Sequence, residues 1–511
     1  MATLCSVELE SRDRFFYLGA GKVDFGEDLL SSNDRKRGVE LSGLKQAIVG
    51  SRLIGYRDEV FLSDIYLDHR EVTPNSIFAA VRGSKSDGRD FIDEAIVRGA
   101  SAILLSEERS SSVPLLVVPE DSIRREIARA AAIVYGNPSE AIKVIGVTGT
   151  NGKTTVVHVL SQALETLGHP CGELGTLWGR LTTPEAPELQ RQLREFVNAG
   201  KRYAAIEVSS IALDRHRTDF VNFETAIFTN LSQDHLDVHG SMENYYQAKL
   251  KLFRDRTTTK RAVVFASDPY GQRVLREAEV PLRAVGMEDV EGYRLSGQGT
   301  EFTYKGRKFR SPLVGVHNLA NLLVVVATLE GLGFNLDEIS RALEGAGEPK
   351  GRLEFIDEGQ NFDVVIDYAH TPAAMKAVLE ALSLRLSTGA RLITVFGCGG
   401  DRDRYKRPEM GRVASTLSAH VVITNDNPRS EDPRDIAVEI ASGVVPGSHI
   451  ETVLDRRDAM ARAISVARPG DVVLIAGKGH ERRQIIKDEE IAFDDTEVAR
   501  EILRSYLGVD K

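Results

Sequence analysis

Several features that would place the protein in other classes are scarce in this sequence. It has only three cysteines, Cys5, Cys171 and Cys398, and they lie far apart without the spacing of metal ligands. So few cysteines support no disulfide framework and suit a reducing cytosol. Residues 1–16 lack the apolar core of a signal peptide, and no apolar run reaches the ~18 residues that a membrane span needs. We therefore expect a soluble protein of the cytoplasm.

An excess of positive charge is also missing, since the formal net charge is −10. Nonspecific nucleic-acid binding rests on clustered cations and is not expected here. A small anionic substrate held by a few local arginines remains open. The sequence has no internal repeats or low-complexity tracts, and its 511 residues exceed what one hydrophobic core supports. About three domains are expected.

Hydrophobic patterning predicts an α/β fold that begins after a polar extension at residues 1–38. In a small α/β domain, 39–138, strands are expected at Ser76–Gly83 and Ser101–Ser106, with a helix at Asp90–Ala100. The turn-rich stretch Tyr135–Glu140 ends this domain. Domain 139–347 has a buried strand, a glycine-rich turn and a helical run, and further strands separated by helical stretches predict a mainly parallel sheet. Near Gly347–Glu354 the pattern restarts, and 348–511 alternates strands with helices as in a doubly wound, Rossmann-like domain.

The sharpest local signal is VTGTNGKTT, from Val147 to Thr155, which follows a predicted strand and opens a predicted helix. In that context glycines let backbone N–H groups close on phosphate oxygens, and the helix N-terminus adds partial positive charge. The strict phosphate-loop pattern places glycine five residues before Gly152, where this chain has Val147, so the loop is a variant. The residues predicted to bind ATP here are Gly149, Thr150, Asn151, Gly152, Lys153, Thr154 and Thr155, with Lys153 on the β- and γ-phosphates and Thr154 on Mg²⁺.

Two more polar residues follow predicted strands of the same domain. Glu207 ends the strand Tyr203–Val208 and is placed to reach Mg²⁺. His235 lies in TNLSQDHLDVHG, beyond the carboxyl end of the next strand, where open α/β sheets bind ligands. A lone histidine is more often structural, so a functional role for His235 is supported only if other site residues lie beside it.

These segments together resemble the Mur ligase family, which builds the cytoplasmic precursor of bacterial peptidoglycan. The resemblance runs from about Leu41 to Arg500. The motifs shared across the family are GTNGKTT, TNLSQDHLD, YYQAKLKLF, GVHNLAN, GRLE and DYAHTP; those similar to the branch that adds the third residue of the stem peptide are LTTPEAPELQ, GCGGDRD, DNPR and GKGHERRQ.

The resemblance implies several nucleotide and metal contacts. Lys249 in YYQAKLKLF would be carbamylated by CO₂ and would ligate a second Mg²⁺ beside His235, whereas Lys251 would face elsewhere. Asn318 would contact adenine, Arg352 the phosphates and Asp367 the ribose, with His370 close by. Two Mg²⁺ ions, held by Thr154, Glu207, His235 and carbamylated Lys249, are expected.

The resemblance also implies contacts to a UDP-linked muropeptide. The expected residues are His69, Ser84, Lys85, Thr182, Thr183, Ser209, Arg215 and Arg217. Two positions depart from the family pattern: Ile211 replaces a histidine, and His69 replaces a serine before the arginine of LDHREV. Both departures touch substrate-binding regions.

The loop Thr424–Pro433 points to the incoming amino acid. A guanidinium binds a carboxylate bidentately, and lysine has no distal carboxylate to offer, so Arg429 favours meso-diaminopimelate. By the resemblance, Arg402, Asp426, Asn427, Pro428, Arg429, Gly477 and Glu481 would hold the amino acid.

The expected protein is thus a monomeric ligase that uses ATP and magnesium to add meso-diaminopimelate to UDP-N-acetylmuramoyl-L-alanyl-D-glutamate through an acyl phosphate, in cell-wall synthesis. Three alternatives stay open: the same reaction with L-lysine, a related enzyme such as a folylpolyglutamate synthase, and a Mur-like interaction protein without catalysis. A folylpolyglutamate synthase is not expected to carry an N-terminal uridine-nucleotide domain. A non-catalytic protein would be favoured by the loss of Lys153, Glu207, His235 or Lys249, and all four are present.

Overall fold

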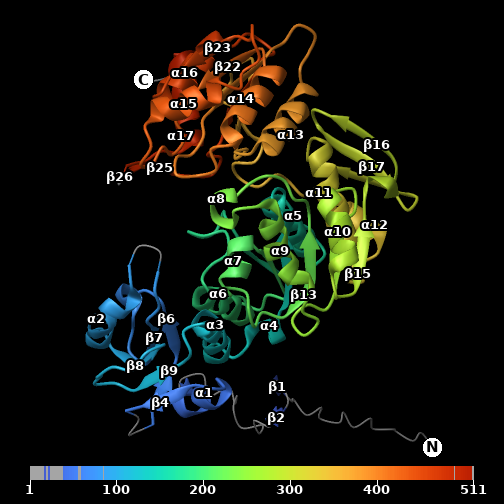
Figure 1. Cartoon of the computed structure of the whole chain (residues 1–511). Coiled ribbons are helices and arrows are strands. Elements are labelled where there is room, and N and C mark those ends of the chain that lie inside the picture. The colour runs from blue at the N-terminus through green and yellow to red at the C-terminus, as the bar shows by residue number, and fades with distance from the viewer. Residues whose placement is uncertain are drawn as a thin grey trace, which may run out of the picture. The chain divides into compact units, whose positions relative to one another are not determined.

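The computed structural model describes residues 16–18, 21–23, 38–55, 59–83, 86–487 and 489–508. The chain divides into two compact units, Met1–Tyr135 and Gly136–Lys511 (Figure 1). Most of the predicted extension 1–38 lies outside the described residues, and within it β1 (Phe16–Leu18) pairs antiparallel with β2 (Gly21–Val23). Ser84 and Lys85 also lie outside the described residues. In the described part of the chain, no helix is long and apolar enough to cross a lipid bilayer.

The N-terminal unit is built on a five-stranded sheet. Its elements are β3 (Val39–Glu40), α1 (Leu41–Ala47), β4 (Arg52–Ile54), β5 (Phe61–Leu62), β6 (Asp64–Tyr66), η3 (His69–Glu71), β7 (Ser76–Ala79), η4 (Gly88–Phe91), α2 (Ile92–Val97), β8 (Ala100–Leu105), β9 (Leu115–Val117) and α3 (Ile123–Val134). The order is β4-β9-β8-β7-β6, parallel except for β4. Ile77 packs toward α1 and α3, and Phe78 packs toward α2, so both faces of the sheet are covered.

The second unit begins with a six-stranded parallel sheet. Its elements are α4 (Pro138–Ala141), β10 (Lys143–Thr148), α5 (Lys153–Thr166), β11 (Cys171–Leu174), α6 (Ala186–Asn198), β12 (Tyr203–Glu207), α7 (Ser210–Asp214), β13 (Phe223–Phe228), α8 (Leu236–His239), α9 (Met242–Leu250), η5 (Lys251–Phe253), β14 (Ala262–Phe265), α10 (Pro269–Glu277) and β15 (Leu282–Val285). The order is β11-β12-β10-β13-β14-β15. Val144 and Ile145 belong to apolar clusters on opposite faces, which is why this strand reads as continuously hydrophobic.

A three-stranded antiparallel sheet follows, which the sequence did not lead us to predict. The elements are η6 (Met287–Asp289), β16 (Val290–Ser296), β17 (Gly299–Tyr304), β18 (Arg307–Ser311), α11 (Val316–Gly331) and α12 (Leu336–Glu344). Phe302, Tyr304 and Phe309 join the apolar cluster that also holds α5, α11 and α12. This small sheet therefore extends the core on one face of the six-stranded sheet (Figure 1).

The chain ends in a second six-stranded sheet. Its elements are β19 (Glu354–Ile356), β20 (Asp363–Asp367), α13 (Pro372–Ser383), β21 (Leu392–Phe396), α14 (Lys406–Leu417), β22 (His420–Ile423), α15 (Pro433–Ala441), β23 (Ile450–Thr452), α16 (Arg456–Val466), β24 (Val472–Ala476), β25 (Arg483–Ile486), β26 (Glu489–Ala492) and α17 (Asp495–Leu507). The order is β19-β20-β24-β21-β22-β23, with β19 alone antiparallel. Helices α13, α14 and α15 cover one face and α16 and α17 the other, as predicted for a doubly wound sheet.

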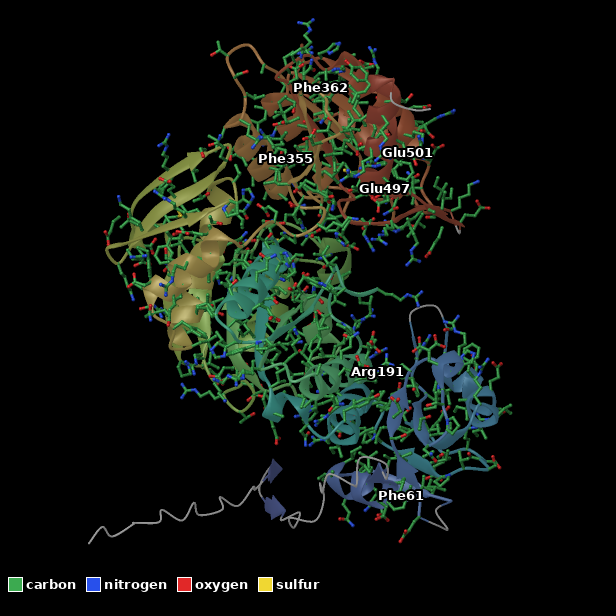
Figure 2. The ribbon with its side chains drawn as sticks, turned by 180° about the vertical axis from the view of Figure 1, so that it is seen from behind. Phe61, Arg191, Phe355, Phe362, Glu497 and Glu501 are labelled. Carbon is green, nitrogen blue, oxygen red and sulfur yellow. The ribbon has the colours of Figure 1, made fainter. Side chains whose placement is uncertain are left out.

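Helix α17 packs on one face of this sheet, and Glu497 and Glu501 mark the helix in the view from behind (Figure 2). The rings of Tyr506 of α17 and Phe362, which precedes β20, form an edge-to-face contact with centroids 5.8 Å apart. Glu501, on the same helix, pairs with Arg457 of α16.

The carboxyl ends of the neighbouring strands β20, β24, β21 and β22 all lead into loops that carry predicted site residues. In a parallel sheet these loops share one edge, so the fold itself brings them together.

Candidate functional site

The loop between β10 and α5 is tightly packed, and only glycine fits at two of its positions. Gly149 has φ +152 and Gly152 φ +86, and a Cβ on Gly149 would lie 1.9 Å from Thr229 Oγ1. Lys153, the first residue of α5, donates from Nζ to the Gly149 and Thr150 carbonyls at 3.0 and 2.9 Å. Burial lowers the pKa of Lys153. The predicted phosphate loop thus lies directly before a helix, and two of its backbone carbonyls accept hydrogen bonds from Lys153.

Two further basic side chains contact this loop from distant parts of the unit. Lys249 is buried in α9 and donates to the Gly149 carbonyl at 2.9 Å. Arg352 Nη2 lies 3.3 Å from Thr154 Oγ1, and the buried Arg352 Nε has no hydrogen-bond partner among the described residues. Burial, and then the charge of Lys153, hold the pKa of Lys249 well below its ordinary value. Three basic side chains close together, one of them with an unmatched N–H donor, are suited to bind a polyphosphate.

Acidic and imidazole groups stand beside these cations. Glu207, at the end of β12, is buried, and its Oε1 accepts hydrogen bonds from Thr154 Oγ1 and the Thr176 N–H, both at 2.9 Å. His235 precedes α8 with the left-handed φ of +54. Burial lowers the pKa of His235 to about 4, so its ring is neutral near pH 7, and a neutral ring is the form that binds a metal. Thr154, Glu207 and His235 therefore offer donors of the kind that the sequence predicted.

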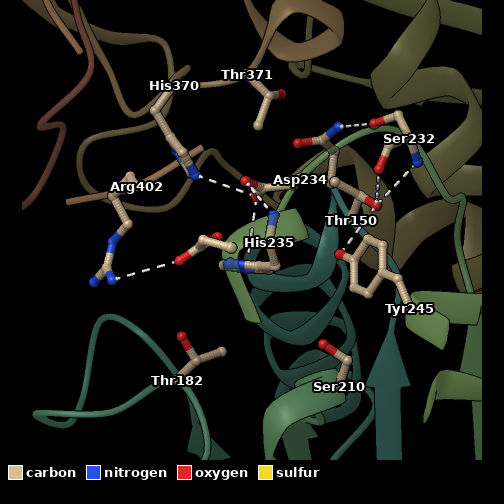
Figure 3. Close-up of polar contacts among 12 residues, drawn as sticks. Thr150, Thr182, Ser210, Ser232, Asp234, His235, Tyr245, His370, Thr371 and Arg402 are labelled. Atoms are coloured by element: carbon tan, nitrogen blue, oxygen red, sulfur yellow. Dashed lines mark hydrogen bonds and ion pairs between the residues drawn. The ribbon is translucent and has the colours of Figure 1, made fainter. Parts of the chain in front are cut away.

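Asp234 is a residue of this site that sequence reasoning missed (Figure 3). Its carboxylate lies 3.5 Å from His235 Nε2, 3.7 Å from His370 Nε2 and 3.7 Å from Lys406 Nζ. Burial alone would raise its pKa, but the hydrogen bond of His370 and the charges of His235 and Lys406 hold the pKa well below the ordinary value. Because His370 follows β20 and Lys406 begins α14, Asp234 joins the two six-stranded sheets of this unit. Its place next to His235 in the QDH motif was the only signal available.

The residues predicted to meet adenosine form a second network. Asn318 Nδ2 donates to Glu348 Oε1 at 2.7 Å, and Asn321 Nδ2 donates to Asn318 Oδ1 at 3.1 Å. Asp367 accepts from the backbone N–H groups of Leu353 and Ala369 at 2.8 and 2.7 Å. Burial, with Asp367 nearby, raises the pKa of Glu348 to about 8. Glu348 is thus a neutral acid near pH 7, and it orients the Asn318 side chain.

The raised pKa of Glu348 predicts a pH dependence of stability. A folded-state pKa above the ordinary value means that the folded chain binds this proton more tightly. The stabilisation is complete below about pH 4.5 and is lost as the pH rises through about 8. Glu348→Gln keeps the neutral shape, so its thermal midpoint should fall less between pH 6 and pH 9 than that of the parent. Exposed Glu344→Gln is the control, and equal pH slopes for parent and Glu348→Gln would contradict the assignment.

Four residues predicted for the muropeptide gather beside Glu207. Thr183 Oγ1 donates to the Glu207 carbonyl and accepts from the Ser209 N–H, both at 2.9 Å. Arg217 donates to the Thr183 carbonyl at 3.0 Å. Thr182 Oγ1 accepts from Thr176, whose N–H also binds Glu207. A carboxylate bound by this group would lie near the phosphate loop.

The other residues predicted for the muropeptide do not join the group beside Glu207. Arg215 is exposed at the end of α7. His69 belongs to the N-terminal unit, where its ring stacks on Phe91 at 4.4 Å and lies 3.2 Å from Glu94. Ile211, at the position of the family's histidine, is half-buried in α7. The contacts with Phe91 and Glu94 fix the position of the His69 ring, but they do not indicate a ligand.

The loops after β21 and β22 bring two arginines together. Arg429 adopts φ +51, and its Nη1 donates to the Gly400 carbonyl at 2.7 Å. Its backbone pairs with Ile486 of β25. Burial, and then the charge of Arg402, lower the pKa of Arg429. Arg429 Nη1 and Arg402 Cγ lie 2.9 and 3.6 Å from the position that a Cβ on Gly399 would take. Two neighbouring arginines favour a bound anion, such as a substrate carboxylate.

The DNPR loop is held to the loop after β24 by a buried lysine that sequence reasoning missed. Lys478 is fully buried, and its Nζ donates to Asn427 Oδ1 at 3.1 Å and to Glu481 Oε2 at 3.2 Å. Asn427 Nδ2 also donates to Glu481, at 2.9 Å. Gly477 has φ +112, and a Cβ there would lie 2.7 Å from Asp426 Oδ2. Asp426, Asn427, Gly477 and Glu481 are thus brought together, and Pro428 follows Asn427 in the DNPR loop.

A buried ion pair lies beneath both loops. Arg456 and Asp495 have no exposed side-chain surface, and Arg456 Nε donates to Asp495 at 2.8 Å. The other guanidinium nitrogens donate to the Asn425 carbonyl at 3.1 Å and the Ala476 carbonyl at 3.0 Å. One arginine therefore fixes the points at which the DNPR and GKGH loops leave their strands.

Comparison with known proteins agrees with this geometry. Three family models match: "Mur ligase family, catalytic domain" over residues 63–148, "Mur ligase middle domain" over 147–329, and "Mur ligase, glutamate ligase domain" over 351–479. A protein of Gloeobacter violaceus named UDP-N-acetylmuramoyl-L-alanyl-D-glutamate–2,6-diaminopimelate ligase is 42% identical over 87% of this chain and 94% of its own. One of the same name from Geobacillus thermodenitrificans is 41% identical over 85% and 93%. The chain belongs to the Mur ligase family.

Solved structures agree on the fold. A structure of UDP-N-acetylmuramoyl-L-alanyl-D-glutamate–2,6-diaminopimelate ligase matches with a TM-score of 0.61 and 29% identity, over 92% of this chain and 99% of that one. A MurF ligase from Thermotoga maritima, solved in complex with ADP, matches with a TM-score of 0.65 and 20% identity, over 89% and 100%. The α/β architecture predicted from the sequence is confirmed.

Proposed function

We propose that the protein is an ATP-dependent ligase that adds meso-diaminopimelate to UDP-N-acetylmuramoyl-L-alanyl-D-glutamate in cytoplasmic peptidoglycan precursor synthesis. The observation that carries the proposal is that Lys153 and Lys249 both donate to the Gly149 carbonyl, while Arg352 reaches Thr154, whose hydroxyl donates to Glu207. The names of the relatives from Gloeobacter and Geobacillus support the same reaction. Addition of L-lysine is the second candidate.

The proposed chemistry is carboxylate activation followed by aminolysis. The γ-carboxylate of the D-glutamyl residue attacks the γ-phosphate of ATP in line and forms an acyl phosphate and ADP. Lys153 and Arg352 offset the negative charge that develops on the phosphoryl oxygens. The amine of diaminopimelate then attacks the acyl carbon, loses a proton, and displaces phosphate. Catalysis comes from positioning and electrostatics more than from a side-chain nucleophile.

The donor set also fits Mg²⁺, whose role would be to bind and neutralise phosphate oxygens. Thr154, Glu207, His235 and carbamylated Lys249 would hold two ions. The depressed pKa of Lys249 supports the carbamate, because only a neutral amine adds to CO₂. The amine nitrogen bonds to the carbon of CO₂ and releases one proton, so a buried neutral amine would become an anion able to ligate metal.

Within the second unit, ATP and the amino acid would bind along the edge where the strands end. The residues proposed for ATP are Gly149 to Thr155, Asn318, Arg352 and Asp367; for the muropeptide, His69, Ser84, Lys85, Thr182, Thr183, Ser209, Arg215 and Arg217; and for the amino acid, Arg402, Asp426 to Arg429, Gly477 and Glu481. We also propose that the chain acts as a monomer, with functional domains at 39–138, 139–347 and 348–511.

Phosphate release tests this function directly. The purified protein would be supplied with Mg·ATP and the UDP-muramoyl dipeptide, with meso-diaminopimelate and L-lysine offered in parallel. Turnover that requires the dipeptide and prefers diaminopimelate is expected. A preference for lysine would keep the ligase and overturn the diaminopimelate assignment. No turnover with either, while ATP binds, would favour a Mur-like interaction protein.

Arg429→Lys tests the amino-acid assignment separately. Lysine keeps the charge but loses the two parallel hydrogen bonds, so kcat/KM for diaminopimelate should fall about 10- to 100-fold. The KM for ATP should stay near that of the parent. Exposed Arg434→Lys on α15 is the matched control. An unchanged kcat/KM for diaminopimelate in Arg429→Lys would remove this arginine from the substrate site.

A further inference from the structure

A second group of metal-binding side chains lies at the opposite end of the C-terminal sheet. His420 begins β22, Glu451 lies within β23, and His449 immediately precedes β23. One ligand atom from each lies within 4.8 Å of the others. The amino-acid loops leave the carboxyl ends of the strands, whereas these residues stand at or near the amino ends. The cluster is therefore separate from the proposed catalytic site.

Inside the cluster, a buried imidazole nitrogen faces a carboxylate oxygen. His420 is 4% exposed, and its Nε2 lies 2.9 Å from Glu451 Oε1. Apart from this ion-pair contact, none of the described residues bonds to His420 Nε2. The ring of His449 lies 4.1 Å from that of His420, centroid to centroid. An imidazole nitrogen and a carboxylate oxygen that face each other in this way share a natural partner, a cation.

We propose that His420, His449 and Glu451 bind a divalent transition-metal ion of the zinc class. Two imidazoles and one carboxylate suit zinc, whereas Mg²⁺ prefers oxygen ligands alone. His449 is exposed and gives the ion a path from solvent. Since β22 and β23 are neighbours and β23 is the edge strand, the ion would tie the last strand of the sheet to the next.

Arg462 of α16 competes with the ion for the carboxylate. Its Nε donates to Glu451 Oε2 at 2.9 Å and its Nη2 to Oε1 at 3.0 Å. To bind the metal, Glu451 must release at least one carboxylate oxygen from Arg462. The guanidinium charge that stays nearby also repels the metal ion. Removal of the guanidinium should therefore strengthen metal binding, while removal of His449 should weaken it. These opposite signs distinguish a metal site from a histidine pair that only packs.

The experiment measures zinc binding to the full chain by equilibrium dialysis in excess MgCl₂. The parent should bind one more Zn²⁺ than His449→Ala, or bind it at least about tenfold more tightly. Arg462→Gln should bind more tightly than the parent. His216→Ala is the matched control, since the His216 ring pairs with Asp219 at 2.9 Å outside the cluster and should leave binding unchanged.

Thermal unfolding gives an independent readout. Zinc should raise the midpoint of the parent and of Arg462→Gln, but not that of His449→Ala, whose replaced side chain is exposed and leaves the core intact. Equal zinc affinity in parent and His449→Ala overturns the proposal. So does an Arg462→Gln variant that binds no more tightly than the parent.

Discussion

Replacing Lys249 with alanine is expected to reduce turnover by at least about 100-fold while the protein stays folded. The amine is fully buried, 2.9 Å from the Gly149 carbonyl and 4.6 Å above the Tyr245 ring. If it carries the carbamate, its loss removes both a metal ligand and the negative charge that balances the phosphate-loop cations. The lost hydrogen bond to Gly149 should cost about 1 to 3 kcal/mol in unfolding free energy. Phosphate release and urea unfolding separate the two effects.

Two further variants sharpen the Lys249 experiment. Lys251→Ala changes an exposed lysine on the adjoining turn that pairs with Asp214, and it should keep full activity. Lys249→Glu places a carboxylate where the carbamate would stand, and it should recover part of the activity that alanine loses. A folded Lys249→Glu protein as inactive as Lys249→Ala would argue against the carbamate. Parent-like turnover in Lys249→Ala would remove this lysine from the mechanism.

Breaking the ion pair of Arg456 and Asp495 is expected to give the largest loss of stability. Arg456→Met leaves the Asp495 carboxylate buried without its partner, which should cost about 3 to 5 kcal/mol in unfolding free energy. Arg457→Met, on the next residue, breaks an exposed pair with Glu501 and should cost at most about 1 kcal/mol. Urea unfolding monitored by circular dichroism measures both.

The double variant Arg456→Met/Asp495→Leu separates stability from positioning. With both charges removed, most of the loss should be recovered, because replacing a buried pair with apolar groups is often close to neutral. The Asn425 and Ala476 carbonyls would still lack their shared donor, so KM for diaminopimelate should stay raised while KM for ATP returns toward the parent value. If KM for diaminopimelate also recovers, the arginine stabilises the fold without positioning the loops.

Both large sheets could be predicted because their strands are buried on two faces and read as short apolar runs. Strands β10 and β20 are examples, and each leads into a motif. Thr154 and Glu207 could be chosen because each follows a strand end, and the fold places these ends together. The three-stranded sheet of β16 to β18 was not predicted, because its strands are partly exposed and carry no continuous apolar run.

The missed residues share a physical reason. Asp234 meets His370 and Lys406, and Arg456 meets Asp495, only after the chain has folded, and these partners lie 39 to 172 positions apart. Lys478 lies inside a motif, but nothing local shows that its amine is fully buried. Local patterns identify strand ends and turns, whereas these contacts depend on which strands become neighbours.

Four non-glycine residues in the site loops, His235, Leu353, Asp401 and Arg429, adopt left-handed backbone conformations with φ between +42 and +54. Each such conformation costs about 1 kcal/mol or more, and glycine or asparagine would adopt it more readily. Selection for heat resistance would therefore favour glycine or asparagine at His235 and Arg429, and selection for turnover would remove those same variants. At these two positions thermal stability and catalytic activity make opposite demands, so stabilising mutagenesis should leave His235 and Arg429 unchanged.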